Sequence, residues 1–157
     1  FTPVADNAVR YALDIKEGPG DYIYFLRKQG SRTRIYRFDE NAGGPPESLE
    51  RISGSYATFD YDENGNMFLG GRSRLKVMKP DLALVDYDMY DDFNINTVRL
   101  YNNELFVLAE YSGTDTLNNP SGIYKNQITS TDGQLDTTNT LVLDWSLSGD
   151  YQFSFYN

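Results

Sequence analysis

The sequence predicts an all-β fold, and two features support this prediction. The composition includes thirteen Tyr and nine Phe but three Met, and aromatic side chains fit the pleated, half-buried surface of a sheet. Apolar and polar residues also alternate with the two-residue period of a strand that buries one face. The 157 residues, 39% of them hydrophobic, are enough for one domain with a core of its own.

The first strand-like segment has an apolar side chain at every second position: Val9, Tyr11, Leu13 and Ile15. Gly18-Pro19-Gly20 ends this segment too early for a helix. Three further strand-like segments follow, at 21–27, at 34–39 and in a short stretch that ends at Ile52. Four strands joined by short polar corners predict an up-and-down antiparallel sheet.

The same order of segments recurs along the chain. The second round has strand-like segments at 56–60, 66–69, 74–78 and 82–86, and the third at 97–101, 104–108, 122–125 and 141–145. Residues 151–156 look like the start of a further round. The rounds therefore extend approximately over 8–53, 54–93 and 94–148, within a single all-β domain or domain fragment. A period of about 40 residues is typical of repeats with four strands each.

The second round contains the string Asp62-Glu63-Asn64-Gly65-Asn66, followed by the apolar run Met67-Phe68-Leu69. This turn and strand resemble a blade of a β-propeller of the extracytoplasmic kind, and the resemblance extends over nearly the whole chain. It implies about three four-stranded antiparallel blades that form part of a β-propeller, with a β-sandwich or barrel as the alternative. Since closed arrays start at about four blades, we expect the chain to need further blades or a second copy.

Composition and charge exclude several classes of function. The chain has no Cys and no His, so disulfides, thiolate chemistry and the commonest general base are absent. Its net charge of −9 disfavours nucleic acid as a partner, because such binding depends on basic side chains. No apolar stretch is long enough to cross a bilayer, so we expect no membrane insertion. The acidic, Asn-, Asp-, Tyr- and Gly-rich composition and the first residue, Phe1, favour an extracellular or periplasmic location.

The Asp-rich turn of the second round allows two interpretations. Asp60, Asp62 and Asn64 place oxygen side chains at alternate positions, as a calcium loop does, and Gly65 permits a sharp turn. The same Asn-Gly pair is typical of a tight turn between two strands. The equivalent turns of the other rounds lack the alternating oxygens. We therefore favour a purely structural turn, with calcium at these three residues as the alternative and no other cofactor.

Basic residues gather around the second hairpin of the first two rounds. Because equivalent hairpins of successive blades project from the same face, the two groups should be neighbours. The paired N–H donors of arginine suit carboxylate or sulfate groups. Alternatively, the basic residues pair with Asp and Glu across the sheet. The candidate binding residues in these groups are Arg27, Arg32, Arg34, Arg72, Arg74 and Lys76.

The segment 86–92 combines four carboxylates with Tyr87 and Tyr90. These tyrosines are candidate stacking surfaces for a sugar, although a solvated acidic loop is the simpler interpretation.

Two functions of different class follow from these observations. The favoured one is a non-catalytic binding or scaffold module of an exported protein, which presents propeller loops to a glycan or protein partner. The alternative is part of a polysaccharide lyase or glycoside hydrolase, in which Asp, Glu, Tyr and Arg carry the reaction. The sequence nominates no catalytic pair, so whether the chain is an enzyme stays open.

Overall fold

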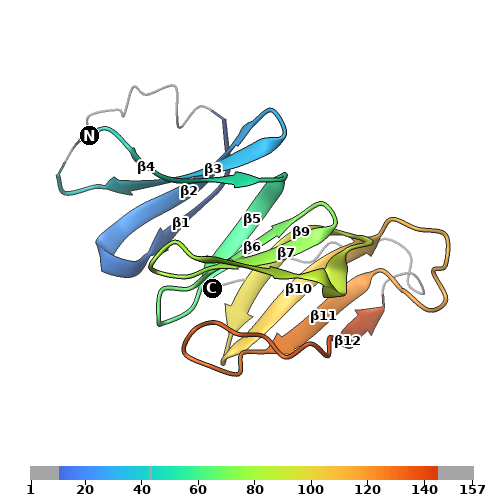
Figure 1. The fold of residues 1–157 in the computed structure, drawn as a ribbon. Helices are drawn as coiled ribbons and strands as arrows, with labels where there is room; N and C mark the ends of the chain where they lie inside the picture. The colour runs from blue at the N-terminus through green and yellow to red at the C-terminus, as the bar shows by residue number, and fades with distance from the viewer. Residues whose placement is uncertain (1–10, 43, 145–157) are drawn as a thin grey trace.

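A computed structural model describes residues 11–42 and 44–144 of the chain. In this part, twelve strands form three four-stranded antiparallel sheets, each with its strands in chain order (Figure 1). The predicted fold class is therefore confirmed: the protein is all-β, and its repeated unit is a four-stranded antiparallel sheet. The three separate sheets fit a propeller-like arrangement rather than a two-sheet sandwich or a single barrel.

Sheets 1 and 2 lie within the spans of the first two rounds, and sheet 3 begins one residue before the span of the third. Sheet 1 contains β1 (Ala12–Gly18), β2 (Tyr22–Gln29), β3 (Arg32–Asp39) and β4 (Glu47–Ser53). Sheet 2 contains β5 (Tyr56–Tyr61), β6 (Met67–Gly71), β7 (Arg74–Met78) and β8 (Leu84–Tyr87). Sheet 3 contains β9 (Phe93–Tyr101), β10 (Glu104–Tyr111), β11 (Gly122–Gln127) and β12 (Thr140–Asp144). Two 3-10 turns, η2 (Pro19–Asp21) and η3 (Asp88–Tyr90), lie between strands. Val9 and the further strand expected at 151–156 lie outside the described residues.

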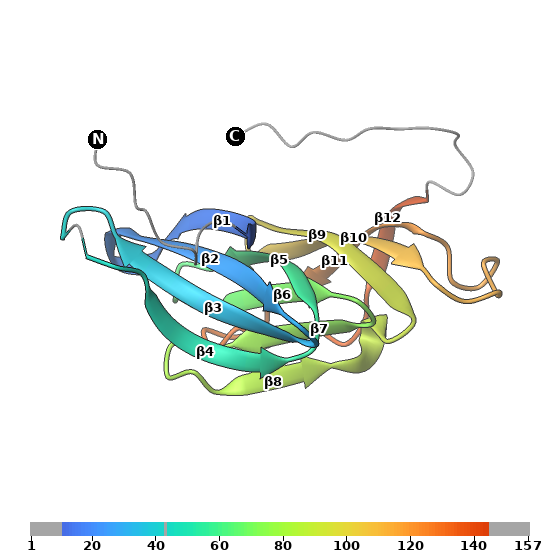
Figure 2. The same ribbon diagram turned by 90° about the horizontal axis from the view of Figure 1, so that it is seen from above.

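Sheet 2 lies between the other two sheets (Figures 1 and 2). On one face, Met67 and Leu69 pack in a cluster with Leu26 of sheet 1. On the other face, Phe68 packs in a cluster with Val98 of sheet 3. Strand β6 is consequently buried at all five positions. Burial on both faces explains why Met67-Phe68-Leu69 is a continuous apolar run, whereas strands with one buried face alternate.

The first strands of the three sheets, β1, β5 and β9, lie next to one another. Side-chain oxygens of β1 accept a hydrogen bond from the backbone of β5, and side-chain oxygens of β5 accept hydrogen bonds from the backbone of β9. The donor N–H groups and their acceptors are Phe59 to Asp14 (3.0 Å), Val98 to Thr58 (3.4 Å) and Leu100 to Asp60 (2.9 Å). We call these three contacts the seam. Because β1, β5 and β9 are edge strands of their sheets, the seam gives partners to backbone donors that no neighbouring strand pairs.

Two tyrosines of the interior are shielded from water. Tyr90 is fully buried, and its hydroxyl donates a hydrogen bond to Oδ1 of Asn126 (2.6 Å). The ring of Tyr61 packs against Tyr24, with centroids 4.8 Å apart. Burial raises the pKa of both hydroxyls far above the usual range, and a neighbouring tyrosine contributes to each rise.

We expect Tyr61 and Tyr90 to ionise only when the protein unfolds. Their folded-state pKa values lie above the unfolded value of about 10, so the stability linked to them is complete below about pH 10 and is lost as the pH rises further. Ultraviolet absorbance of tyrosinate during alkaline titration, with and without denaturant, measures this. Tyr90→Phe should remove one of the late-ionising groups. Ionisation of all thirteen tyrosines in one step near pH 10, with the fold intact, would contradict the prediction.

Candidate functional site

A groove of about 290 Å³ opens between sheets 2 and 3, at the end of the molecule that carries the β5–β6 and β9–β10 turns. We call it the turn groove. Its lining includes Tyr61, Asp62, Glu63, Tyr101, Asn102 and Asn103. A concave surface with aromatic rings and a few polar groups is the usual form of a ligand site.

Hydrogen bonds of Asp62 fix the β5–β6 wall of the turn groove. Its Oδ1 accepts from the backbone N–H of Asn64 (2.9 Å) and Asn66 (2.8 Å), and its Oδ2 accepts from the Asn66 side-chain amide (2.7 Å). Gly65 has a φ of 83°, a conformation that glycine adopts without strain. The tight turn that the sequence predicted is therefore present.

The calcium alternative relied on Asp60, Asp62 and Asn64. Asp60 lies on β5, where one oxygen accepts the seam bond from Leu100 and the other lies 3.6 Å from Nζ of Lys16. Asp62 uses both oxygens within the turn. Among the described residues, no three or more His, Cys, Asp or Glu side chains are grouped to hold a metal ion. The structure thus gives these carboxylates partners within the protein.

The β9–β10 wall is a two-residue turn. Asn102 and Asn103 both have positive φ, 49° and 62°, as a type I′ hairpin requires. The Asn103 side-chain amide donates to the carbonyl of Ile128 (3.0 Å), which ties the turn to the chain after β11. Tyr101, the last residue of β9, has 66% of its surface exposed. This wall therefore presents an accessible aromatic ring on a fixed hairpin.

Tyr61 contributes to the groove lining, but its ring lies between sheets 1 and 2, against Tyr24 and beside Gly18. Its hydroxyl is buried and has no hydrogen-bond partner among the described residues. A buried hydroxyl without a partner costs about 1–3 kcal/mol, which the packing of the ring against Tyr24 and Phe59 offsets. Because burial raises its pKa, the hydroxyl stays protonated at neutral pH and can donate or accept. Tyr61 and Glu63 also line a groove of about 250 Å³ on the other side of the β5–β6 turn.

The structure places the basic candidates in three groups. Lys76 lies opposite Asp86 on β8 and forms an ion pair with it, as the cross-sheet alternative predicted. Arg27 and Arg34 face each other on β2 and β3, and neither forms an ion pair with a described residue. Arg32, Arg72 and Arg74 are exposed, at the β2–β3 and β6–β7 turns.

The two tyrosines proposed as stacking surfaces have structural contacts instead. Tyr90 is fully buried in the core between sheets 2 and 3, a placement that does not suit a surface platform. Tyr87 is half-buried, and its hydroxyl accepts a hydrogen bond from the backbone of Leu135 (3.0 Å). Sequence reasoning missed Tyr61, Glu63 and Tyr101. For Tyr101, the sequence did contain a signal: an aromatic residue directly before the two-residue turn Asn102-Asn103.

Comparison with known proteins gives little further information. No protein-family model matches the sequence. No curated protein matches it either. A solved structure from Bacteroides eggerthii, titled Bifunctional GH43-CE, aligns with 83% of this chain at 14% identity and a TM-score of 0.46. The chain spans 19% of the length of that protein. At this TM-score, the likeness carries no argument about function.

Among the described residues, no helix has the length and apolar character needed to cross a membrane.

Proposed function

We propose that the chain is a non-catalytic glycan-binding module of an exported protein, and that the turn groove is its binding site. The observation that carries this proposal is the exposed ring of Tyr101 in a groove that polar side chains also line. A glycan partner also agrees with an extracellular or periplasmic location, which we propose together with this function.

The groove offers what a sugar ring needs from a protein. A pyranose has an apolar C–H face, which an exposed tyrosine ring covers, and a rim of hydroxyl groups that donate and accept hydrogen bonds. Glu63 and Asn102 line the groove and are exposed, so their oxygens and amide are accessible to these hydroxyls.

The carboxylates of the groove favour binding over hydrolysis. Most glycoside hydrolases use two carboxyl groups, one as acid and one as base or nucleophile. Asp62 and Glu63 are the carboxylates in the groove lining, and Asp62 already accepts three hydrogen bonds that hold the turn. Glu63 alone does not provide the pair, so part of a lyase or hydrolase remains the alternative function.

Tyr101→Ala should weaken retention of a bound polysaccharide by about tenfold, because loss of a stacking ring costs on the order of 1 kcal/mol. Affinity electrophoresis in gels containing cellulose, xylan, mannan or starch derivatives measures this. Tyr101→Phe keeps the ring and should bind nearly as well. Leu117→Ala, at a side chain 96% exposed in the β10–β11 loop, is a control that should bind as the parent does.

Two results would count against this proposal. Equal retention of Tyr101→Ala and the parent chain would place the binding site elsewhere. New reducing ends or unsaturated products from the same polysaccharides would instead support the enzyme alternative.

A further inference from the structure

The end of the molecule opposite the turn groove brings three backbone segments together. They are the β2–β3 turn, the β4–β5 connection and the β6–β7 turn. The N–H of Gly54 donates to the carbonyl of Ser31 (3.1 Å), and the N–H of Arg72 donates to the carbonyl of Ser55 (3.2 Å). The buried Thr33 hydroxyl donates to the carbonyl of Gly54 (3.1 Å). These bonds hold the two turns in fixed positions on either side of the connection.

The β6–β7 turn places Arg74 over the connection. Gly54 has a φ of 111°, and a Cβ at this position would lie 3.1 Å from a terminal guanidinium nitrogen of Arg74. Burial raises the pKa of Tyr56 to about 12, and the neighbouring Arg74 opposes that rise. Tyr56 is therefore neutral at ordinary pH, so its hydroxyl does not offset the charge of Arg74.

Arg32, Arg72 and Arg74, which we call the basic platform, share this end of the molecule. All three are exposed, and none forms an ion pair with a described residue. Of the other described basic residues, five are paired with carboxylates, whereas Arg27, Lys28, Arg34, Arg51 and Arg99 form no such pair. The pairs are Lys16–Asp60, Arg37–Glu47, Lys76–Asp86, Lys79–Asp132 and Lys125–Glu104. The platform thus concentrates unpaired positive charge on an acidic protein.

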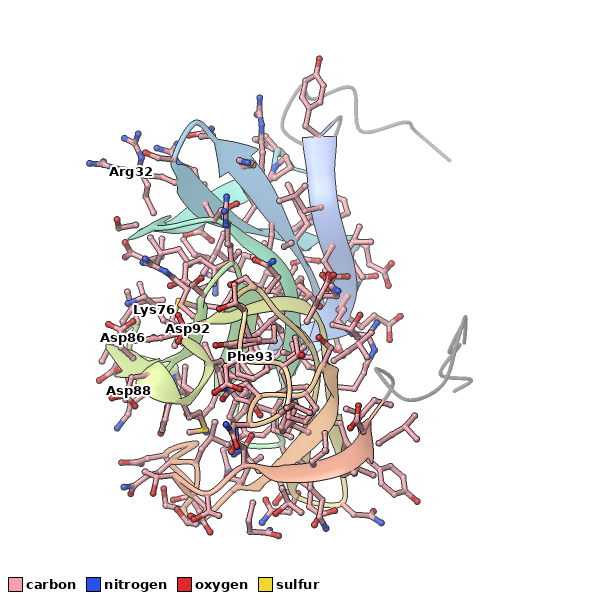
Figure 3. The ribbon with its side chains drawn as sticks, turned by 90° about the vertical axis from the view of Figure 1, so that its right-hand side faces the viewer. Arg32, Lys76, Asp86, Asp88, Asp92 and Phe93 are labelled. Atoms are coloured by element: carbon pink, nitrogen blue, oxygen red, sulfur yellow. The ribbon has the colours of Figure 1, made fainter. Side chains whose placement is uncertain are left out.

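Carboxylates border the platform on one side. The N–H of Ser73 donates to the carbonyl of Phe93 (2.7 Å), and Arg72 forms a β-bridge with Asn94. Asp91 and Asp92, directly before Phe93, are exposed. Arg32 lies on the same side of the molecule as Asp88 and Asp92 (Figure 3). Asp91 and Asp92 therefore lie close in the chain to the backbone partners of the β6–β7 turn, which carries Arg72.

We propose that the basic platform binds a carboxylate group of an acidic saccharide. Arginine binds carboxylate through paired, charge-assisted hydrogen bonds. The hydroxyl groups of the same saccharide can donate to the bordering Asp91 and Asp92, whereas a continuous row of phosphates would meet these carboxylates and be repelled. This second surface involves none of the turn-groove residues and does not depend on the proposed function of that groove.

The test compares binding of polygalacturonate and its fully methyl-esterified form, which lacks the free carboxylates, at low ionic strength. The parent chain should bind the acid form, and affinity should fall as salt is added. Arg32→Gln with Arg72→Gln should weaken this binding by about tenfold, since two charge-assisted contacts are lost. Lys125→Gln with Arg99→Gln on sheet 3 makes the same charge change and should leave binding unchanged. Arg32→Lys with Arg72→Lys keeps the charge but loses the paired donors, and should be intermediate.

Several results would overturn this inference. They are absence of binding to polygalacturonate at low salt, equal binding of the esterified form, and an equal loss in the sheet 3 control variant. Poly-glutamate bound more tightly than polygalacturonate would indicate an acidic peptide as partner. Tyr101→Ala should leave polygalacturonate binding unchanged, which distinguishes failure at the platform from failure at the turn groove. Thermal melts of each variant check that the fold is intact.

Discussion

Replacing Phe68 with alanine should lower the free energy of unfolding by about 3–5 kcal/mol, the largest single effect that we expect. Phe68 is fully buried on β6, in the cluster that joins sheets 2 and 3 through Val98, Leu105 and Val107. Its removal leaves a cavity between two sheets whose backbones are held by the seam and cannot close it fully. Urea unfolding followed by circular dichroism measures the change.

Phe106→Ala is the matched control, because Phe106 is the half-buried aromatic of the corresponding strand of sheet 3. Its side chain lies on the opposite face from Leu105 and Val107, which belong to the core, so the same substitution should cost clearly less. A loss as large as that of Phe68→Ala would mean that this face is covered in solution. Such a result would support our expectation that the chain needs further blades or a second copy.

Asp60→Ala should lower the free energy of unfolding by about 1–3 kcal/mol, the second largest effect. The substitution leaves the N–H of Leu100 without its acceptor and Lys16 without its ion-pair partner, and an unpaired buried donor carries the full cost of its desolvation. The measurement is the urea midpoint at constant slope.

Asp60→Asn separates the two contributions, because an amide oxygen can still accept from Leu100 but carries no charge for Lys16. This variant should lose less than 1 kcal/mol, since a partly exposed ion pair contributes little. Equal losses for Asn and Ala would mean that the charge, and not the seam bond, stabilises β5 against β9. A melting temperature that calcium raises in the parent, and not in Asp60→Ala, would support the metal alternative.

Most of the strand pattern was predictable because local rules determine it. Asn64-Gly65 sets a tight turn wherever it lies between two apolar segments, and the strand predicted at 74–78 is β7 as observed. The strand predicted at 97–101 begins four residues earlier, at Phe93, because β9 bends at a register shift between Leu108 and Ala109 of β10. An alternation rule does not detect such an irregularity.

The site was less predictable because it depends on contacts between sheets. The turn groove needs Tyr61 from sheet 2 and Tyr101 from sheet 3, and their separation in space is set by sheet twist and packing. In the sequence, Tyr90 resembles an exposed ring in an acidic loop, but η3 directs it into the core, where its hydroxyl donates a hydrogen bond to Asn126. Lys76 lies directly opposite a carboxylate, Asp86, and forms an ion pair with it. The register of β7 and β8 determines this pairing, and the spacing of the residues in the sequence does not reveal it.

The seam has a consequence for how an array of this kind can change in evolution. Strand β5 provides a donor to the sheet before it, the N–H of Phe59, and acceptors to the sheet after it, Thr58 and Asp60. A sheet whose first strand carries both the donor and the acceptors can be duplicated in tandem. Each new contact between sheets then has a donor on one first strand and an acceptor on the neighbouring first strand. Duplication of a whole sheet therefore preserves the contacts, whereas gain or loss of a single strand reverses the chain direction and breaks them.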